Sequence, residues 1–145
     1  MQGFPHHYAV SARAAESGDV TLSAAGLADI ASAPPAEFDG PGDRWSPESL
    51  LVAAVADCFV LTFRAIARAS KLDWLELSCE AGGELDRVER ATQFTALSLK
   101  ATLRVPAGAD TEKAERLLHK AEAGCLITNS LKCPVTLDCE VVQGD

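Results

Sequence analysis

The chain has 145 residues, of which 48% are hydrophobic and 23% are charged, and its formal net charge is −8 at pH 7. This length and composition predict a single globular domain over residues 1–145, because a second full domain would not fit. The negative charge excludes a nucleic-acid binder and a protein of anionic membrane surfaces, since neutralising phosphates requires clustered lysine and arginine.

The N-terminal segment gives no sign of export, and the apolar stretch gives no sign of membrane insertion. Residues 1–10 lack the basic region, apolar run and small-residue cleavage site of a secretory signal. The most apolar stretch, residues 50–63, is interrupted by Asp57 and is shorter than the about 20 residues that a spanning helix needs. We therefore expect a cytoplasmic protein whose apolar stretch is a buried helix.

The N-terminal third predicts a β-hairpin followed by a loop. Apolar or small residues alternate with polar ones over residues 8–24, and the turn-forming segment 16–19 divides this stretch in two. Residues 31–45 are rich in proline and glycine and predict a loop. We therefore expect the loop to deliver the chain to the next regular element.

Residues 46–69 predict the central helix of the fold. Ser46 is a suitable N-cap, Pro47 fits the first helical position, and Glu48 places a negative charge in the first turn. The helix is apolar on nearly all sides over residues 50–63 and becomes amphipathic toward residue 71.

The C-terminal half predicts two strands, a helix and a final strand. Alternation indicates half-buried strands over residues 75–81 and 97–105. Asp110 or Thr111 caps a helix that stops at Gly124, and alternation resumes over residues 133–141. The connections are short enough for antiparallel pairing outside the 31–45 loop, so the fold class is α+β.

The five cysteines predict neither a disulfide framework nor a metal site. Their number is odd, the sequence lacks a C-x-x-C motif, and His119 stands alone in the interior of the chain. The neighbouring His6 and His7 are interpreted as solvated residues, and no metal or cofactor is expected. Strand parity places three cysteines in the core, namely Cys79, Cys133 and Cys139.

Two motifs in the right order resemble the signatures of the OsmC/Ohr family. WSPESLLVAAVADCF (45–59) is similar to an N-P-E-x-L motif that is followed by a small apolar run ending in Cys-Phe. HKAEAGCLITNSLKCPVTLDCEV (119–141) is similar to the family's second signature, a helix leading into a final strand. The resemblance extends from about Tyr8 to Val142 and implies antiparallel sheets around a long central helix in an intertwined homodimer.

The resemblance also implies a function, a thiol peroxidase (peroxiredoxin activity) that reduces organic hydroperoxides in the response to oxidative stress. Cys58 matches the peroxidatic cysteine, Cys125 the resolving cysteine, and Glu48 a glutamate that organises the site. The thiolate would become a sulfenic acid, which the second thiol converts to a redox-active disulfide. An external dithiol or a lipoyl-bearing protein would restore the two thiols.

Helix geometry places a constraint on Glu48 and Cys58. These residues are ten positions apart, which corresponds to about 15 Å along one helix. If Glu48 acts beside Cys58, a second copy of the helix packed antiparallel is the most direct arrangement. This agrees with the homodimer that the family implies.

The sequence departs from the family pattern at the activating arginine. Glu37 stands where the OsmC branch carries arginine, in a stretch similar to R-F-E-G, and a carboxylate there would oppose thiolate formation. Arg44 is our candidate for the missing charge, with a plain surface role as its alternative, and Arg13 could supply the charge from the first hairpin. Leu126 replaces the proline that usually follows the resolving cysteine, which alters the backbone and not the thiol. The glycine-rich stretch of the Ohr branch is absent, so the superfamily is assigned and the branch is left open.

Two further functions remain as alternatives. A non-catalytic dimer could bind a small apolar ligand at the subunit interface, in a pocket lined by Phe38, Trp45 and Phe59, although each of these is more often plain packing. A cysteine hydrolase would need a histidine base near Cys58, and His119 is predicted to lie on the charged side of its helix.

Overall fold

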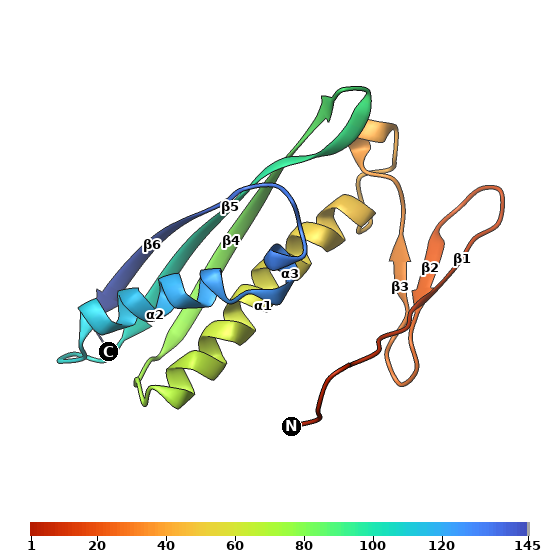
Figure 1. Ribbon diagram of the computed structural model, residues 1–145. Helices are drawn as coiled ribbons and strands as arrows, with labels where there is room; N and C mark the ends of the chain where they lie inside the picture. The colour runs from red at the N-terminus through yellow and green to blue at the C-terminus, as the bar shows by residue number, and fades with distance from the viewer. Residues whose placement is uncertain (145) are drawn as a thin grey trace. The chain divides into compact units, whose positions relative to one another are not determined.

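The computed structural model describes residues 1–144. The chain divides into two compact units, residues 1–51 and the part from residue 52 onward. Each unit contains one three-stranded sheet (Figure 1).

The first unit is a small antiparallel sheet of three short strands. β1 (Ser11–Arg13) pairs with β2 (Val20–Ser23), which confirms the opening hairpin, and Gly18 adopts a φ of 95° between them. β2 also pairs with β3 (Ile30–Ser32). This third strand corrects the prediction of a loop from residue 31, because backbone pairing with β2 overrides the weak local signal in this segment.

The remainder of the predicted loop is ordered by backbone hydrogen bonds. It contains the 3-10 helix η1 (Ala36–Phe38), and the carbonyl of Pro35 accepts hydrogen bonds from the N–H groups of Phe38 (2.9 Å) and Gly40 (3.0 Å). A Cβ atom at Gly40 would collide with the carbonyl of Pro34, so only glycine fits there. The N–H of Ala33 donates to Trp45 at 2.9 Å, which holds the end of the loop beside β3.

The central helix, α1 (Pro47–Ala69), begins where the sequence predicts. Ser46 is its N-cap, because the N–H of Ser49 donates to Ser46 Oγ at 3.1 Å and the N–H of Ser46 donates to Ser49 Oγ at 2.9 Å. This reciprocal pair satisfies two backbone donors, as a capping box does. Four side chains at a spacing of one helical turn are buried: Val55, Phe59, Phe63 and Ala67.

The length and composition of α1 would allow it to cross a membrane. Its most apolar 18-residue window has a mean hydropathy of 2.0, and 22% of that window is buried. The helix is therefore less buried than the sequence predicts for its apolar stretch. One such helix is weak evidence for insertion, because the core helix of a globular domain has the same composition, and the buried face of α1 packs into a core shared with a sheet and a second helix.

The second unit contains the larger sheet, with the order β4-β5-β6. β4 (Glu76–Val88) and β5 (Ala91–Val105) form a long antiparallel hairpin, whose turn residues Glu89 and Arg90 have φ values of 49° and 73°. β6 (Val135–Gln143) pairs with β5 in parallel, unlike the antiparallel pairing expected throughout. A parallel return requires a long connection, and the helices between β5 and β6 supply it.

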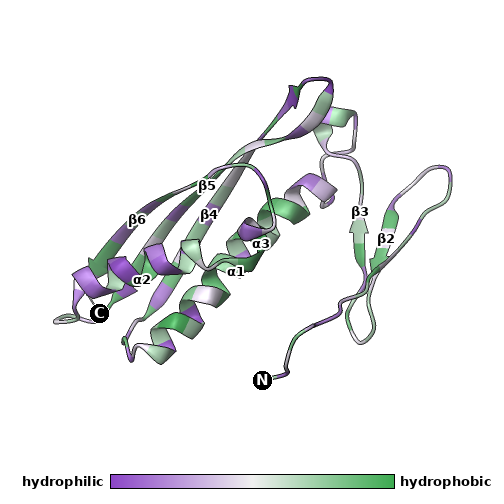
Figure 2. Cartoon of the chain, in the orientation of Figure 1, coloured by the Kyte–Doolittle hydropathy of each residue, from purple (hydrophilic) through white to green (hydrophobic). Residues whose placement is uncertain are grey.

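Two helices connect β5 to β6. α2 (Thr111–Ala123) is capped by Asp110, whose carboxylate accepts from the N–H of Lys113 at 3.0 Å, and ends at Gly124 as predicted. A short helix that the sequence does not predict, α3 (Leu126–Asn129), follows. α1 and α2 lie on the same face of the sheet (Figure 1), and Figure 2 shows that α2 is mostly hydrophilic where α1 carries long hydrophobic stretches.

One hydrophobic core joins α1, α2 and the β4-β5-β6 sheet. It is built from alternate residues of β5 together with one face of each helix. The fully buried large side chains of this core are Val55, Phe59, Phe63, Leu97, Leu99, Leu103, Val105 and Leu118. The α+β fold with antiparallel strands and a long helix is thereby confirmed.

Candidate active site

Cys58 lies in the middle of α1 and is half-buried. It opens onto a surface hollow of about 470 Å³ that is lined mainly by apolar groups. The residues around this hollow come from α1 and from the start of α3: Ala54, Asp57, Cys58, Leu61, Thr62, Ala65, Leu126 and Ile127. A thiol in this position can be reached by a small apolar molecule from solvent.

Cys125 lies beside Cys58 and is fully buried. It is the N-cap of α3, directly after the end of α2, and the Thr128 hydroxyl donates to its carbonyl at 3.2 Å. The helix end is close to α1, because a Cβ atom at Gly124 would lie 3.9 Å from the Thr62 methyl group. The fold thus brings together the two cysteines that the sequence singles out, and both are free thiols.

Hydrogen bonds hold the pKa of the Cys58 thiol below its usual range. Burial raises this pKa, but donors that favour the thiolate outweigh the effect of burial. These donors are the backbone N–H of Ile127, the thiol of Cys125, the hydroxyl of Thr62, whose oxygen lies 3.8 Å from Sγ, and the backbone N–H of Leu126. A thiolate is the reactive form of cysteine, so this arrangement favours the reactive form of Cys58.

The pKa values of three other cysteines are raised. Burial raises the pKa of Cys125, and its hydrogen bond to Cys58 also raises it, since the Cys125 proton is the one donated. Burial likewise raises the pKa of Cys79 and of Cys139, and neighbouring carboxylates add to the shift. Cys58 is therefore the thiol best suited to act as the nucleophile, with Cys125 held protonated beside it.

The backbone N–H of Leu126 provides a direct test of this activation. Leu126→Pro removes that donor at the first position of α3, where the fixed φ of proline is tolerated. The pKa of Cys58 is then expected to rise, so less thiolate exists at neutral pH and alkylation by iodoacetamide should slow roughly two- to tenfold. The rate is measured against pH by mass spectrometry of the Cys58 peptide.

The matched control is Leu126→Ala, which removes the side chain and keeps the N–H. It should leave the alkylation profile of Cys58 unchanged. Equal slowing in both variants would mean that the apolar side chain, and not the backbone donor, sets the reactivity.

Glu48 and the two candidate arginines lie in the first unit. One carboxylate oxygen of Glu48, Oε1, is buried and accepts no hydrogen bond from any residue within 1–144. Arg44 pairs with Asp19 at 3.1 Å and with Asp43 at 3.6 Å, and the hydrogen bond to Asp19 raises its pKa. Arg13 is exposed on β1. The groups that shift the pKa of Cys58 all belong to the second unit.

The three aromatic residues predicted to bind a ligand have different surroundings. Phe38 and Trp45 are exposed, each at 52%. Phe59 is fully buried in the core and does not line the hollow at Cys58. Its assignment as a ligand-binding residue is corrected, because consecutive residues of a helix point in different directions and Cys58 takes the direction toward the hollow.

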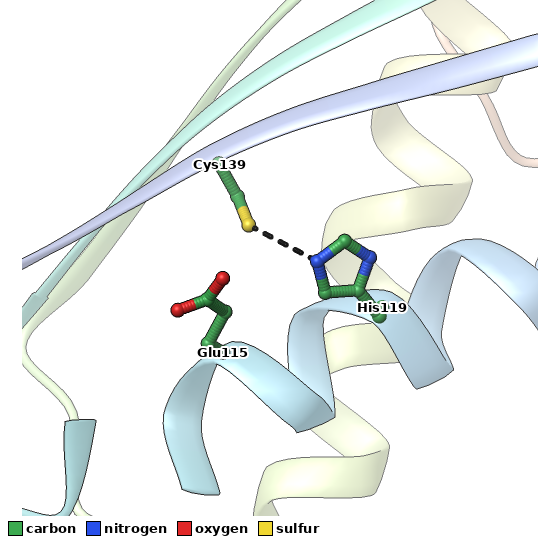
Figure 3. A group of neighbouring side chains, drawn as sticks. All are labelled: Glu115, His119 and Cys139. Atoms are coloured by element: carbon green, nitrogen blue, oxygen red, sulfur yellow. Dashed lines mark hydrogen bonds between the residues drawn. The ribbon is translucent and has the colours of Figure 1, made fainter. Parts of the chain in front are cut away.

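His119 and Cys139 have closer neighbours than the sequence indicates. The ring nitrogen Nε2 of His119 lies 3.6 Å from Sγ of Cys139, and the Glu115 carboxylate completes a group whose ligand atoms are within 4.8 Å of one another (Figure 3). His119 therefore does not stand alone, and the half-buried Cys139 is more than a core residue. No histidine is among the described residues that line the hollow at Cys58, which leaves a cysteine hydrolase without a base.

Sequence reasoning missed three contributors to the site, namely Thr62, Leu126 and Ile127. Thr62 follows Cys58 by one helical turn, so the i, i+4 spacing could have identified it. The backbone donors of Leu126 and Ile127 depend on α3, which the sequence does not predict. Leu126 was interpreted as a change of backbone alone, but its N–H reaches the Cys58 thiol.

Several known proteins are similar to this chain in sequence. Residues 40–140 match a protein family described as OsmC-like protein. The chain is 28% identical to the uncharacterized protein YmaD of Bacillus subtilis over 73% of each chain. It is 31% identical to peroxiredoxin OsmC of Escherichia coli over 64% of each chain.

Solved structures have the same fold. An OsmC-like protein of unknown function from Vibrio cholerae superposes with a TM-score of 0.86 at 18% identity, covering 94% of this chain and 100% of that chain. An organic hydroperoxide resistance protein OsmC from Legionella pneumophila gives a TM-score of 0.75 at 25% identity, covering 97% and 99%. The family match extends over more than half of this chain, so the chain belongs to the OsmC-like family, which includes peroxiredoxins.

Proposed function

We propose that this protein is a thiol peroxidase that reduces organic hydroperoxides through Cys58 and Cys125. The observation that carries the proposal is the pairing of the two thiols, one half-exposed with a lowered pKa and the other buried and protonated beside it. Membership of a family that includes peroxiredoxins supports the same chemistry.

The reaction divides into two steps at the sulfur atoms. The Cys58 thiolate attacks the terminal oxygen of ROOH, the O–O bond breaks, and the alkoxide takes a proton to leave as ROH. Cys58 is then a sulfenic acid, and the Cys125 sulfur attacks it, forming the disulfide and releasing water. A dithiol or a lipoyl-bearing protein returns two electrons and two protons by thiol–disulfide exchange.

The hollow at Cys58 favours an organic peroxide over hydrogen peroxide. Leu61 and Leu126 line it and remain exposed at 48% and 65%, so they offer apolar surface to a substrate. Phe38 and Trp45 are also proposed as substrate contacts, and their exposure to solvent is the observation that supports this. A hydroperoxide with an aromatic or alkyl group would gain from this burial, whereas hydrogen peroxide would not.

A homodimer is the proposed functional form, with α1 packed antiparallel against its copy. The partly exposed apolar surface of α1 supports this arrangement, because pairing would remove that surface from water. The orphaned Glu48 oxygen also requires a donor. Arg44, released from Asp19, or Arg13 could supply it, and the charge would further favour the Cys58 thiolate.

Four broader expectations accompany the proposal. The two compact units are taken as parts of one family domain over residues 1–145. The protein acts in the cytoplasm, as an antioxidant in the response to oxidative stress, without nucleic-acid or membrane partners. These expectations follow from the family and from the charge of the chain.

Single-turnover oxidation tests the proposal. The reduced protein is mixed with one equivalent of cumene hydroperoxide or hydrogen peroxide, free thiols are counted over time, and the linkage is mapped by mass spectrometry. We expect loss of two thiols per chain, a Cys58 to Cys125 disulfide, and faster reaction with the organic peroxide. Cys133→Ser serves as the control and should behave like the parent.

Slow and unselective oxidation without that linkage would refute the peroxidase. The hollow would then be better explained as a binding site for a small apolar ligand. In that case, an apolar probe should bind equally well to the parent and to Cys58→Ala.

A further inference from the structure

A second cluster of reactive side chains lies between α2 and β6 of the larger unit. Glu115 and His119 project from successive turns of α2 toward Cys139 on β6 (Figure 3). The three ligand atoms come from a carboxylate, an imidazole and a thiol, all within 4.8 Å of one another. None of the three residues lines the hollow at Cys58, so the cluster is separate from the proposed peroxidase site.

Local structure explains why these side chains converge. Glu115 and His119 have the i, i+4 spacing that places two residues on one face of a helix. Cys139 belongs to the half-buried residues of β6, which alternate with exposed ones, and α2 packs on this strand. The cluster therefore bridges two elements that are far apart in the sequence.

The distance between the sulfur and the imidazole nitrogen matches tetrahedral zinc coordination. With a Zn–S bond of about 2.3 Å and a Zn–N bond of about 2.0–2.1 Å, sulfur and nitrogen lie about 3.6 Å apart in a tetrahedral site. The distance between Cys139 Sγ and His119 Nε2 is 3.6 Å. The carboxylate oxygen of Glu115 lies within 4.8 Å of both atoms, so its side chain must move closer for all three to bind one ion.

The surroundings leave room for an open coordination position, although Arg116 and Lys120 also line the adjoining hollow. Within residues 1–144, Glu115 forms no ion pair. A hollow of about 600 Å³ adjoins Glu115 and His119, so solvent can reach a fourth position. Zinc sites with three protein ligands keep such a position for water or another ligand.

We propose that Glu115, His119 and Cys139 bind one Zn²⁺ ion, which links α2 to β6 and holds a water in its fourth position. Thiolate, imidazole and carboxylate are all ligands of zinc, and this mixed set disfavours magnesium and calcium, which prefer oxygen alone. The Cys139 proton is released to solvent when the sulfur binds the metal.

Zinc titration of the full chain tests this site. The background variant carries Cys58→Ser and Cys125→Ser, which removes the other pair of neighbouring thiols. Competition with a chromogenic chelator should show one Zn²⁺ per chain, and adding Cys139→Ser or His119→Gln should weaken binding at least tenfold. Glu115→Gln changes an exposed residue, so the fold should be retained, and zinc binding should weaken because the third ligand is lost. Cys133→Ser, at another half-buried cysteine, should leave the affinity unchanged.

Cobalt provides a spectroscopic check on the ligand set. Co²⁺ added to the background variant should give a thiolate charge-transfer band in the near ultraviolet, which Cys139→Ser abolishes and Cys133→Ser retains. Absence of stoichiometric zinc binding would overturn the proposal. Binding that survives both Cys139→Ser and His119→Gln would do the same, because the metal would then lie elsewhere, for example at His6 and His7.

Discussion

Cys58→Ser is expected to abolish the reduction of cumene hydroperoxide, lowering turnover by at least about a thousandfold, as removal of a catalytic nucleophile does in other enzymes. The reason is chemical, because a serine hydroxyl in this position stays protonated at neutral pH and cannot attack peroxide oxygen. The donors around residue 58 favour an anion that serine does not form. Consumption of peroxide with a dithiol reductant is the measurement, and this prediction rests on the proposed peroxidase.

Cys125→Ser should separate the two steps of the reaction. The first oxidation of Cys58 should persist, so one thiol is lost per chain and a sulfenic acid can be trapped with a dimedone-type reagent. The resolving thiol is missing, but the serine hydroxyl can still donate to the Cys58 thiolate, so the first step should stay close to the rate of the parent. No second thiol should be lost, and overoxidation of the Cys58 sulfenic acid should increase.

Two cysteines outside this pair provide matched controls. Cys79→Ser and Cys133→Ser alter half-buried thiols of the same unit, and neither residue lines the hollow at Cys58. Both variants should retain the activity of the parent. If Cys58→Ser retains it too, the assignment of the nucleophile is wrong, and another thiol must be oxidised first.

The order of the main elements could be predicted because their signals are local. Ser46 and Pro47 mark the start of α1, Asp110 and Gly124 bound α2, and alternation identifies β6. The strand β3 and the parallel pairing of β6 could not be predicted in the same way. Both depend on hydrogen bonds to a strand elsewhere in the chain, which short-range patterns do not encode.

The candidate site was predictable only in part, and for a similar reason. Cys58 and Cys125 were identified through the family resemblance, and the structure places them side by side. Two of the donors that favour the Cys58 thiolate belong to the backbone of a short helix, and the neighbours of His119 are set by the packing of α2 on β6. Phe59 shows the converse, because the sequence places it in a ligand pocket and the helix turns its ring into the core.

Phe63→Ala is expected to have the largest effect on stability. Phe63 is fully buried on the face of α1 that packs into the core, and its ring meets Trp74 edge to face with the centroids 5.4 Å apart. Truncation of a buried phenylalanine lowers the free energy of unfolding by about 3–5 kcal/mol, against a total of about 5–15 kcal/mol for a native protein. Thermal unfolding followed by circular dichroism should show the midpoint fall by about 6–20 °C.

Matched substitutions distinguish the cavity from a general effect of mutating an apolar residue. Leu75→Ala removes a leucine that is 44% exposed, and it should change the free energy of unfolding by less than about 1 kcal/mol. Phe63→Leu should lose an intermediate amount of the free energy of unfolding, because leucine refills part of the cavity that alanine leaves. Similar losses in Phe63→Ala and Leu75→Ala would contradict the packing described for α1. Below its transition, Phe63→Ala should keep the alkylation profile of Cys58, since the donors to that thiol come from Thr62, Cys125 and the start of α3 and not from the core face of the helix.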